Sequence, residues 1–154
     1  MSDQSKIKNI NITGVSTDVV KKQPTYKPRR IKPRIKAVPS IRQIYWCDFE
    51  LAPILPEMGK TRPAVIVSFK HTLNGHCLVL PISTDPQESA SNSWGHELSI
   101  ELEVGRKSYV VCNHLYTVST ARLQPIQGKS ILRLGKGEFN QILTKMMAWL
   151  PKPD

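Results

Sequence analysis

The stretch Gly59–Ser68, GKTRPAVIVS, places an arginine directly before a proline at the start of an apolar run. A proline disfavours the α conformation of the residue before it, so we expect Arg62 to be extended. The apolar residues 64–67 predict a fully buried strand. The sequence therefore predicts a guanidinium group held at the start of a core strand, with Lys60 and Thr61 just before it.

Short apolar runs separated by turn residues continue this pattern through most of the chain, without helical spacing between them. The dipeptide Asn74-Gly75 predicts a tight turn between two of these runs. The segment Glu97–Glu103, ELSIELE, alternates apolar and polar residues and predicts a strand with one solvent-exposed face. The expected strands are 44–49, 63–68, 76–82, 97–103, 108–112, 121–126 and 130–134. Close spacing of these strands indicates a small antiparallel β-barrel.

The end of the chain has a different period. In the segment EFNQILTKMMAWLP, the apolar residues recur at helical spacing. Gly137 can begin this helix and Pro151 ends it. The apolar stripe consists of Phe139, Ile142, Leu143, Met146, Met147 and Leu150. We expect a mainly β fold in which this C-terminal amphipathic helix packs against the barrel.

Most of the positive charge lies in the first 40 residues. The chain has a net charge of +10, of which residues 1–40 contribute +8, with ten Lys and Arg against two Asp. Prolines interleaved with the basic residues prevent a regular helix and keep the segment extended. We therefore expect a basic, proline-containing flexible arm at 1–40 and a folded domain at 41–154. The arm either attracts phosphate groups or is a solvated leader.

The three cysteines, Cys47, Cys77 and Cys112, lie within apolar runs, which is typical of buried free thiols. No C-x-x-C pair occurs, so we expect no structural zinc site. We also expect no cofactor. Reduced thiols are typical of the cytoplasm. The chain shows neither the apolar segment of a secretory signal nor an apolar run of about 18 residues that could cross a membrane. We expect a soluble cytoplasmic protein.

Polar residues follow or precede three of the expected strands. Arg62 precedes one, Ser83 and Thr84 follow the next, and Asn113 and His114 follow a third. If the first two of these strands form a hairpin, Arg62 and Ser83 lie side by side at one rim. A guanidinium group offers forked donors to a phosphate, and a histidine can transfer protons near neutral pH. Alternatively, Ser83 caps a turn and Arg62 faces water.

Four sequence motifs occur in the order IYWCDF, RPAVIVS, CLVLPIS and CNHLYTVSTARL, followed by the amphipathic helix. In this order they resemble the PemK/MazF family, the toxins of bacterial type II toxin–antitoxin systems. The resemblance covers about Ile41 to Leu150. It implies an SH3-like barrel, a homodimer and a cognate antitoxin. It also implies a metal-independent endoribonuclease that cuts single-stranded RNA at short sequences.

The resemblance also implies residue roles. Arg62 matches the family's catalytic arginine, and Ser83 replaces the family's threonine while keeping its hydroxyl group. Glu57 lies in the loop that covers the RNA in the family, and either Glu57 or His114 is the candidate base. The expected catalytic residues are Arg62, Ser83, Glu57 and His114. The expected RNA-binding residues are Lys60, Thr61, Thr84 and Asn113.

Two positions depart from the family pattern. His114 and Met58 stand where glutamines are common, which can change the base preference or the rate. A cut of this kind uses the 2′-hydroxyl of the RNA as nucleophile, so the protein supplies a base, an acid and charge stabilisation. Two other functions fit the same barrel: a toxin that poisons DNA gyrase, and a non-catalytic RNA-binding module. Arg62 before Pro63, together with the hydroxyl of Ser83, favours the nuclease.

Overall fold

The structure, a computed structural model, describes residues 28, 30–49, 54–69, 71–88, 93–128 and 130–153. The chain divides into two units, Met1–Arg30 and Ile31–Asp154, and all the elements below belong to the second. Most of the predicted arm lies outside the described residues, so its flexibility stays a prediction. Ile35, however, is buried within the second unit with 4% of its surface exposed. The segment just before residue 41 therefore contributes to the folded core.

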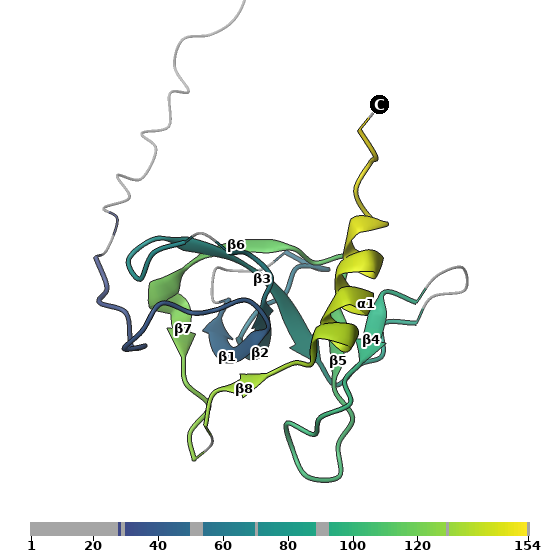
Figure 1. Ribbon diagram of the computed structural model, residues 1–154, viewed down its shortest axis with the longest axis horizontal. Helices are drawn as coiled ribbons and strands as arrows, with labels where there is room; N and C mark the ends of the chain where they lie inside the picture. Colours follow the sequence, from purple (N-terminus) through teal and green to yellow (C-terminus); the bar gives the residue numbers. More distant parts are fainter. Residues whose placement is uncertain are drawn as a thin grey trace, which may run out of the picture. The chain divides into compact units, whose positions relative to one another are not determined.

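The described part of the second unit is an antiparallel sheet with one C-terminal α-helix (Figure 1). The strands are β1 (Gln43–Asp48), β2 (Thr61–Ile66), β3 (His76–Ser83), β4 (Gly95–Glu97), β5 (Tyr109–Val111), β6 (Tyr116–Ser119), β7 (Leu123–Gln124) and β8 (Leu132–Arg133). Their order is β4-β5-β3-β2-β1-β7, while β6 also pairs with β3 and β8 with β1. The sheet curls into a half-barrel, which confirms the predicted fold class.

The central hairpin of the sheet is the one that the Asn74-Gly75 turn predicts. The amide of Gly75 donates to the carbonyl of Thr72 at 3.1 Å and closes the turn. Strands β2 and β3 then pair in the register Ala64↔Pro81 to Ile66↔Val79. On its other edge, β2 pairs with β1, where Cys47 lies opposite Arg62. Strand β2 therefore lies in the middle of the sheet.

The two faces of β2 contribute to two separate hydrophobic cores. Successive side chains of a strand point to opposite faces, so Val65 enters the first core and Ala64 and Ile66 enter the second. The first core consists of Ile44, Val65, Val67, Leu80, Ile82, Leu98, Val110, Cys112, Leu134, Phe139, Ile142 and Met146. The second core consists of Ile35, Tyr45, Cys47, Phe49, Ala64, Ile66, Cys77, Val79, Val118 and Leu123. Burial on both faces explains why residues 64–67 are continuously apolar.

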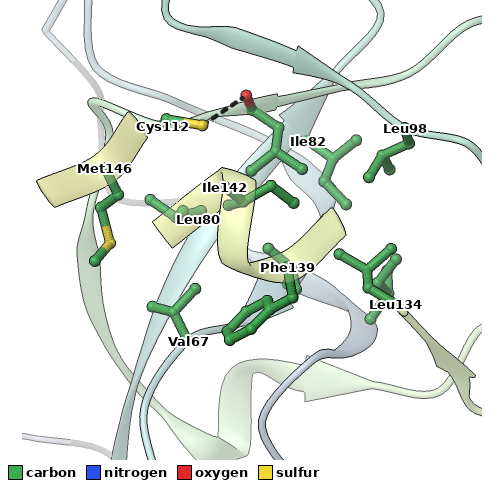
Figure 2. Packing of buried hydrophobic residues seen from close by; sticks show 12 residues of the cluster. Val67, Leu80, Ile82, Leu98, Cys112, Leu134, Phe139, Ile142 and Met146 are labelled. Carbon is green, nitrogen blue, oxygen red and sulfur yellow. Dashed lines mark hydrogen bonds between the residues drawn. The ribbon is translucent and has the colours of Figure 1, made fainter. Parts of the chain in front are cut away.

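Helix α1 (Lys136–Met147) closes the first core, with Phe139, Ile142 and Met146 packed against strand residues (Figure 2). The helix begins after Gly135 and ends before Pro151, and so confirms the predicted helix. Met147 and Leu150, which we expected in the apolar stripe, are 55% and 40% exposed. The helix ends at Met147, so the helical period that would bring Leu150 onto the core face does not continue to that residue.

The strand predicted at 97–103 is wrong, because β4 ends at Glu97, where that strand would begin. The alternating apolar residues Leu98, Ile100 and Leu102 still pack on the first core, so their burial does not require a strand. The carboxylate of Glu138 accepts hydrogen bonds from the amide and the hydroxyl of Ser99, both at 2.8 Å. A helix side chain therefore binds a backbone donor that a neighbouring strand would otherwise bind.

Two further elements differ from the predicted strands. The segment predicted as a strand at 121–126 is a short 3₁₀-helix, η1 (Thr120–Arg122), followed by the two-residue strand β7. Strand β6 was not predicted, and it pairs with β3 from His76↔Ser119 to Val79↔Tyr116. Because β5 and β6 lie along the same edge of β3, the residues that join them are held against the sheet.

The three cysteines are free and buried, as predicted. Burial raises the pKa of Cys47 to about 12 and the pKa of Cys77 and Cys112 to about 11. These thiols are therefore protonated at neutral pH and are poor nucleophiles. They act as small apolar core residues.

Candidate functional site

Arg62 and Ser83 lie at the same edge of the β2–β3 hairpin. Arg62 is the second residue of β2, and Ser83 is the last residue of β3. The paired register of the two strands ends at Ala64↔Pro81, two residues from Arg62 on β2 and two from Ser83 on β3, and Ser83 pairs with Tyr109 of β5. Alternate residues of a strand share a face, so Arg62 lies on the face of Ala64 and Ser83 on the face of Val79, both members of the second core. The hairpin thus places the two residues on one face, near the end that lies away from its turn.

The guanidinium of Arg62 is oriented by the loop before β2. Its Nε donates to the carbonyl of Gly59 at 3.1 Å, and the side chain is half-buried. Among the described residues, the two terminal amino groups of Arg62 have no hydrogen-bond partner. This arrangement fixes the plane of the group and leaves its forked donors for an external acceptor such as a phosphate.

Ser83 is 7% exposed, and its hydroxyl oxygen accepts a hydrogen bond from the amide of Asp85 at 3.1 Å. The turn-capping alternative that we considered for this residue is therefore present. The hydroxyl proton is not used in that bond, so Ser83 can still donate to a ligand. Thr84 is exposed, and its hydroxyl accepts from the guanidinium of Arg106 at 3.3 Å.

His114 lies in the turn between β5 and β6, where its amide donates to the carbonyl of Val111 at 3.2 Å. Its Nδ1 atom is buried and has no hydrogen-bond partner in the described part of the chain. Burial lowers the pKa of His114 below its ordinary value of 6.5. The ring is therefore neutral at neutral pH, which is the protonation state that a general base requires.

Tyr116, which the sequence analysis did not select, connects His114 to the loop before β2. Its ring lies 6.4 Å from that of His114 and 5.2 Å from that of Phe49, edge-on in both cases. Its hydroxyl accepts from the amide of Met58 at 2.9 Å. Tyr116 also lies opposite Val79 and so faces the second core. We call Arg62, Ser83, His114 and Tyr116 the candidate site.

Three of the other predicted residues lie before or at the start of β2. Glu57 is exposed, and its carboxylate accepts from the amide of Ile54 at 2.9 Å within its own turn. No hydrogen bond or ion pair among the described residues joins this carboxylate to Arg62. Lys60 and Thr61 are exposed beside Arg62, with Thr61 paired to Asp48. The structure therefore groups Lys60 and Thr61 with the candidate site, and Glu57 only through the loop that it belongs to.

Asn113 lines an open cavity of about 300 Å³, together with Asp85, Gln87, Glu88 and Trp94. Within the described ranges, no group of three or more His, Cys, Asp or Glu side chains could hold a metal ion. The helix of the described part is too short and too polar to cross a membrane.

Comparisons with known proteins give one family. Residues 41–150 match the family model described as PemK-like, MazF-like toxin of type II toxin-antitoxin system. Among solved structures, MazF (Form-I) from Deinococcus radiodurans is similar with a TM-score of 0.54 and 16% identity, covering 72% of this chain and 94% of that one. Its fold is therefore the same as the one described above. No curated protein matches the sequence.

Two mycobacterial structures are also similar. The Mycobacterium tuberculosis toxin MazF-mt6 aligns with a TM-score of 0.49 and 17% identity, covering 70% of this chain and 95% of that one. An endoribonuclease in complex with its cognate antitoxin, from a mycobacterial species, aligns with a TM-score of 0.49 and 18% identity. The alignment covers 75% of this chain and 100% of that one.

Proposed function

The chain belongs to the PemK-like, MazF-like toxins of type II toxin–antitoxin systems, and from this membership we propose that it is an endoribonuclease that cuts single-stranded RNA without a metal ion. The observation that carries the proposal is the guanidinium of Arg62. Its Nε donates to the carbonyl of Gly59, its terminal amino groups have no hydrogen-bond partner among the described residues, and it shares a face of the hairpin with Ser83. Forked donors beside a hydroxyl group match the oxygens of a phosphodiester.

In the proposed reaction, the 2′-hydroxyl of the RNA loses its proton to a base and attacks the adjacent phosphorus. The bond from phosphorus to the 5′-oxygen of the next nucleotide breaks, and that oxygen takes a proton from water. One product then ends in a 2′,3′-cyclic phosphate, and the other begins with a 5′-hydroxyl. Arg62 stabilises the negative charge that develops on the phosphate, and Ser83 donates a hydrogen bond to one of its oxygens.

We propose His114 as the base. Its ring is neutral at neutral pH, and one buried nitrogen has no hydrogen-bond partner among the described residues. Contacts through Tyr116 and the amide of Met58 connect it to the loop that orients Arg62. Glu57 is the alternative base, but its carboxylate binds the amide of Ile54. Its use would require that turn to open.

Family membership also supports the proposed partners. A toxin of a type II system is held inactive by an antitoxin protein, so we propose that an antitoxin segment covers the candidate site. We further propose that the toxin is a homodimer that binds RNA between its two subunits. Light scattering at micromolar concentration should give about twice the mass of 17.4 kDa. A monomer that cleaves RNA at full rate would contradict this assembly.

The function is tested with end-labelled single-stranded RNA in the presence of EDTA. We expect cuts at a small set of sequences, products with cyclic phosphate ends, and no cut where the nucleotide before the scissile bond is 2′-deoxy. Arg62→Ala should remove the activity. Binding of RNA without cleavage would instead identify a non-catalytic RNA-binding module. Inhibition of gyrase supercoiling without RNA cleavage would identify a gyrase-directed toxin.

A further inference from the structure

The cavity beside the candidate site has one aromatic wall and several polar groups. Trp94 is half-buried and lines it. The other lining residues are Asp85, Gln87, Glu88 and Asn113, and Oδ1 of Asp85 accepts a hydrogen bond from the amide of Gln87 at 2.9 Å, which leaves its second oxygen for a ligand. An aromatic ring surrounded by hydrogen-bonding groups of fixed position is typical of sites that bind a flat heterocycle.

Short-range contacts hold the walls of this cavity in place. A side chain at Gly95 would lie 2.0 Å from the carbonyl oxygen of Pro86, so the loop that carries Asp85 packs directly on the backbone of β4. The carbonyl of Trp94 accepts from the amide of Cys112 at 2.9 Å. The ring of Trp94 also packs edge-on against Trp149, with ring centroids 5.1 Å apart. These contacts hold Trp94 and the backbone of Pro86 in place at the cavity.

Two lining residues of the cavity connect it to the candidate site. The hydroxyl of Ser83 binds the amide of Asp85, which lines the cavity. Asn113, which also lines the cavity, directly precedes His114. A nucleotide whose phosphate lies at Arg62 and Ser83 therefore has neighbours along the RNA whose bases can reach the cavity.

We propose that this cavity binds one base of the RNA substrate and contributes to the choice of cleavage sequence, an inference that rests on the proposed function. The base stacks on Trp94, and Asp85 and Glu88 accept hydrogen bonds from its donor groups. Guanine fits best, because its N1–H and exocyclic N2 amino group are adjacent donors that one carboxylate can bind together. Uracil fits poorly, because its two carbonyl oxygens would face the carboxylates.

A cationic side chain of a protein partner is the competing occupant, since carboxylates and an indole ring also bind guanidinium and ammonium groups. Two observations favour the base. The amides of Gln87 and Asn113 supply both donors and acceptors, which a cation does not need. The connections to Ser83 and His114 also link the cavity to the residues that we propose bind the RNA phosphate.

The first test compares cleavage of a randomised RNA library by the wild type and by cavity variants. Glu88→Gln and Asp85→Asn should relax the preference for guanine at one position and leave the other positions unchanged. Trp94→Ala should lower kcat/KM roughly 5- to 150-fold, as expected for the loss of one stacked base, whereas Trp94→Phe keeps a stacking surface. Glu101→Gln, an exposed acid that does not line the cavity, is the matched control. Unchanged sequence preference in all the cavity variants would overturn the proposal.

The second test measures binding without cleavage and separates this proposal from the proposed function. The probes are 2′-O-methyl hexanucleotides, which lack the nucleophile, with guanine or uracil at the selected position. The indole NMR signal of Trp94, assigned with Trp94→Phe, should shift with the guanine probe and much less with the uracil probe. Shifts without any RNA cleavage by the wild type would refute the nuclease but support the base site. Cleavage without selective shifts, or shifts only with a lysine- or arginine-rich peptide, would refute the base site.

Discussion

Arg62 is the residue on which the proposed chemistry depends most. Arg62→Ala should abolish RNA cleavage and leave the fold intact, because the side chain is half-buried at the start of β2 and is not part of either core. Loss of one preorganised donor at a developing negative charge costs roughly 3–4 kcal/mol. Arg62→Lys keeps the charge but not the fork, and should retain partial activity. The measurements are kcat/KM and the thermal midpoint, and a rate within tenfold of the wild type for Arg62→Ala would contradict the assignment.

His114 should make stability depend on pH. Its pKa is lowered in the folded state, so the unfolded chain binds its proton more readily. The stability that neutral His114 contributes is present above pH 6.5 and is lost as the pH falls toward its folded pKa. Urea unfolding at pH 7.5, 6 and 5 measures this effect. Between pH 7.5 and pH 5, the free energy of unfolding should fall less for His114→Gln than for the wild type.

A matched control is His76→Gln, at an exposed histidine on β3. For this variant, the free energy of unfolding should fall between pH 7.5 and pH 5 by the same amount as for the wild type. If the free energy of unfolding falls equally for His114→Gln and the wild type between pH 7.5 and pH 5, burial of the His114 ring does not make folding depend on pH.

At the residue scale, the sequence predicts the Arg62–Ser83 pair because both residues flank a hairpin whose turn is visible as Asn74-Gly75. It does not predict the contacts of Tyr116. Those contacts require β6 to pair with β3 and the residues before β2 to fold over both strands, and neither event leaves a local pattern. The turn-capping bond of Ser83 is local, and the sequence does suggest it as an alternative.

Among the elements, helix α1 should stabilise the fold only through the side chains of its buried face. Phe139→Ala removes a ring that is 3% exposed in the first core, and should lower the free energy of unfolding by about 3–5 kcal/mol. Met147→Ala changes a side chain that is 55% exposed, and should lower it by no more than about 0.5 kcal/mol. Urea unfolding monitored by circular dichroism measures both changes. Similar losses for the two variants would contradict the packing of the helix described above.

Among the elements, the sequence correctly predicts strands whose apolar residues are buried within the paired sheet. The prediction is wrong where apolar residues are buried without belonging to a strand. The segment 97–103 has the alternation of a strand, but Leu98 is buried against the first core while Ser99 binds Glu138 of the helix. The contact between these segments spans 39 residues, so no local pattern reveals it. Short elements such as β7, with two residues, contain too few residues to show a periodic pattern in the sequence.

For the whole molecule, the N-terminal segment should strengthen RNA binding without setting its specificity. Residues 1–30 carry seven of the 22 Lys and Arg, spaced by prolines near their end. Deleting them should weaken RNA binding and reduce its salt dependence by a log–log slope of roughly 0.7 for each RNA phosphate that the shortened protein no longer neutralises. The cleavage sequence should not change, because basic side chains that bind phosphates do not read bases. A changed cleavage sequence would mean that the segment belongs to the site.

The position of this deletion follows from the structure. A longer deletion, to residue 38, also removes Ile35 from the second core, and should lower the unfolding midpoint. Comparison of the two deletions therefore separates the electrostatic contribution of the N-terminal segment from its contribution to folding. The sequence alone places this boundary later, near residue 41, because Ile35 lies among prolines and basic residues.

The order of the elements has a consequence for folding during synthesis. The first core needs Phe139, Ile142 and Met146 of α1, which follows all the described strands along the chain. A ribosome therefore makes the strands before it makes these side chains, and a nascent chain that reaches only β8 leaves the first core open on the helix side. We expect the half-barrel to gain its full stability only once α1 has emerged from the exit tunnel.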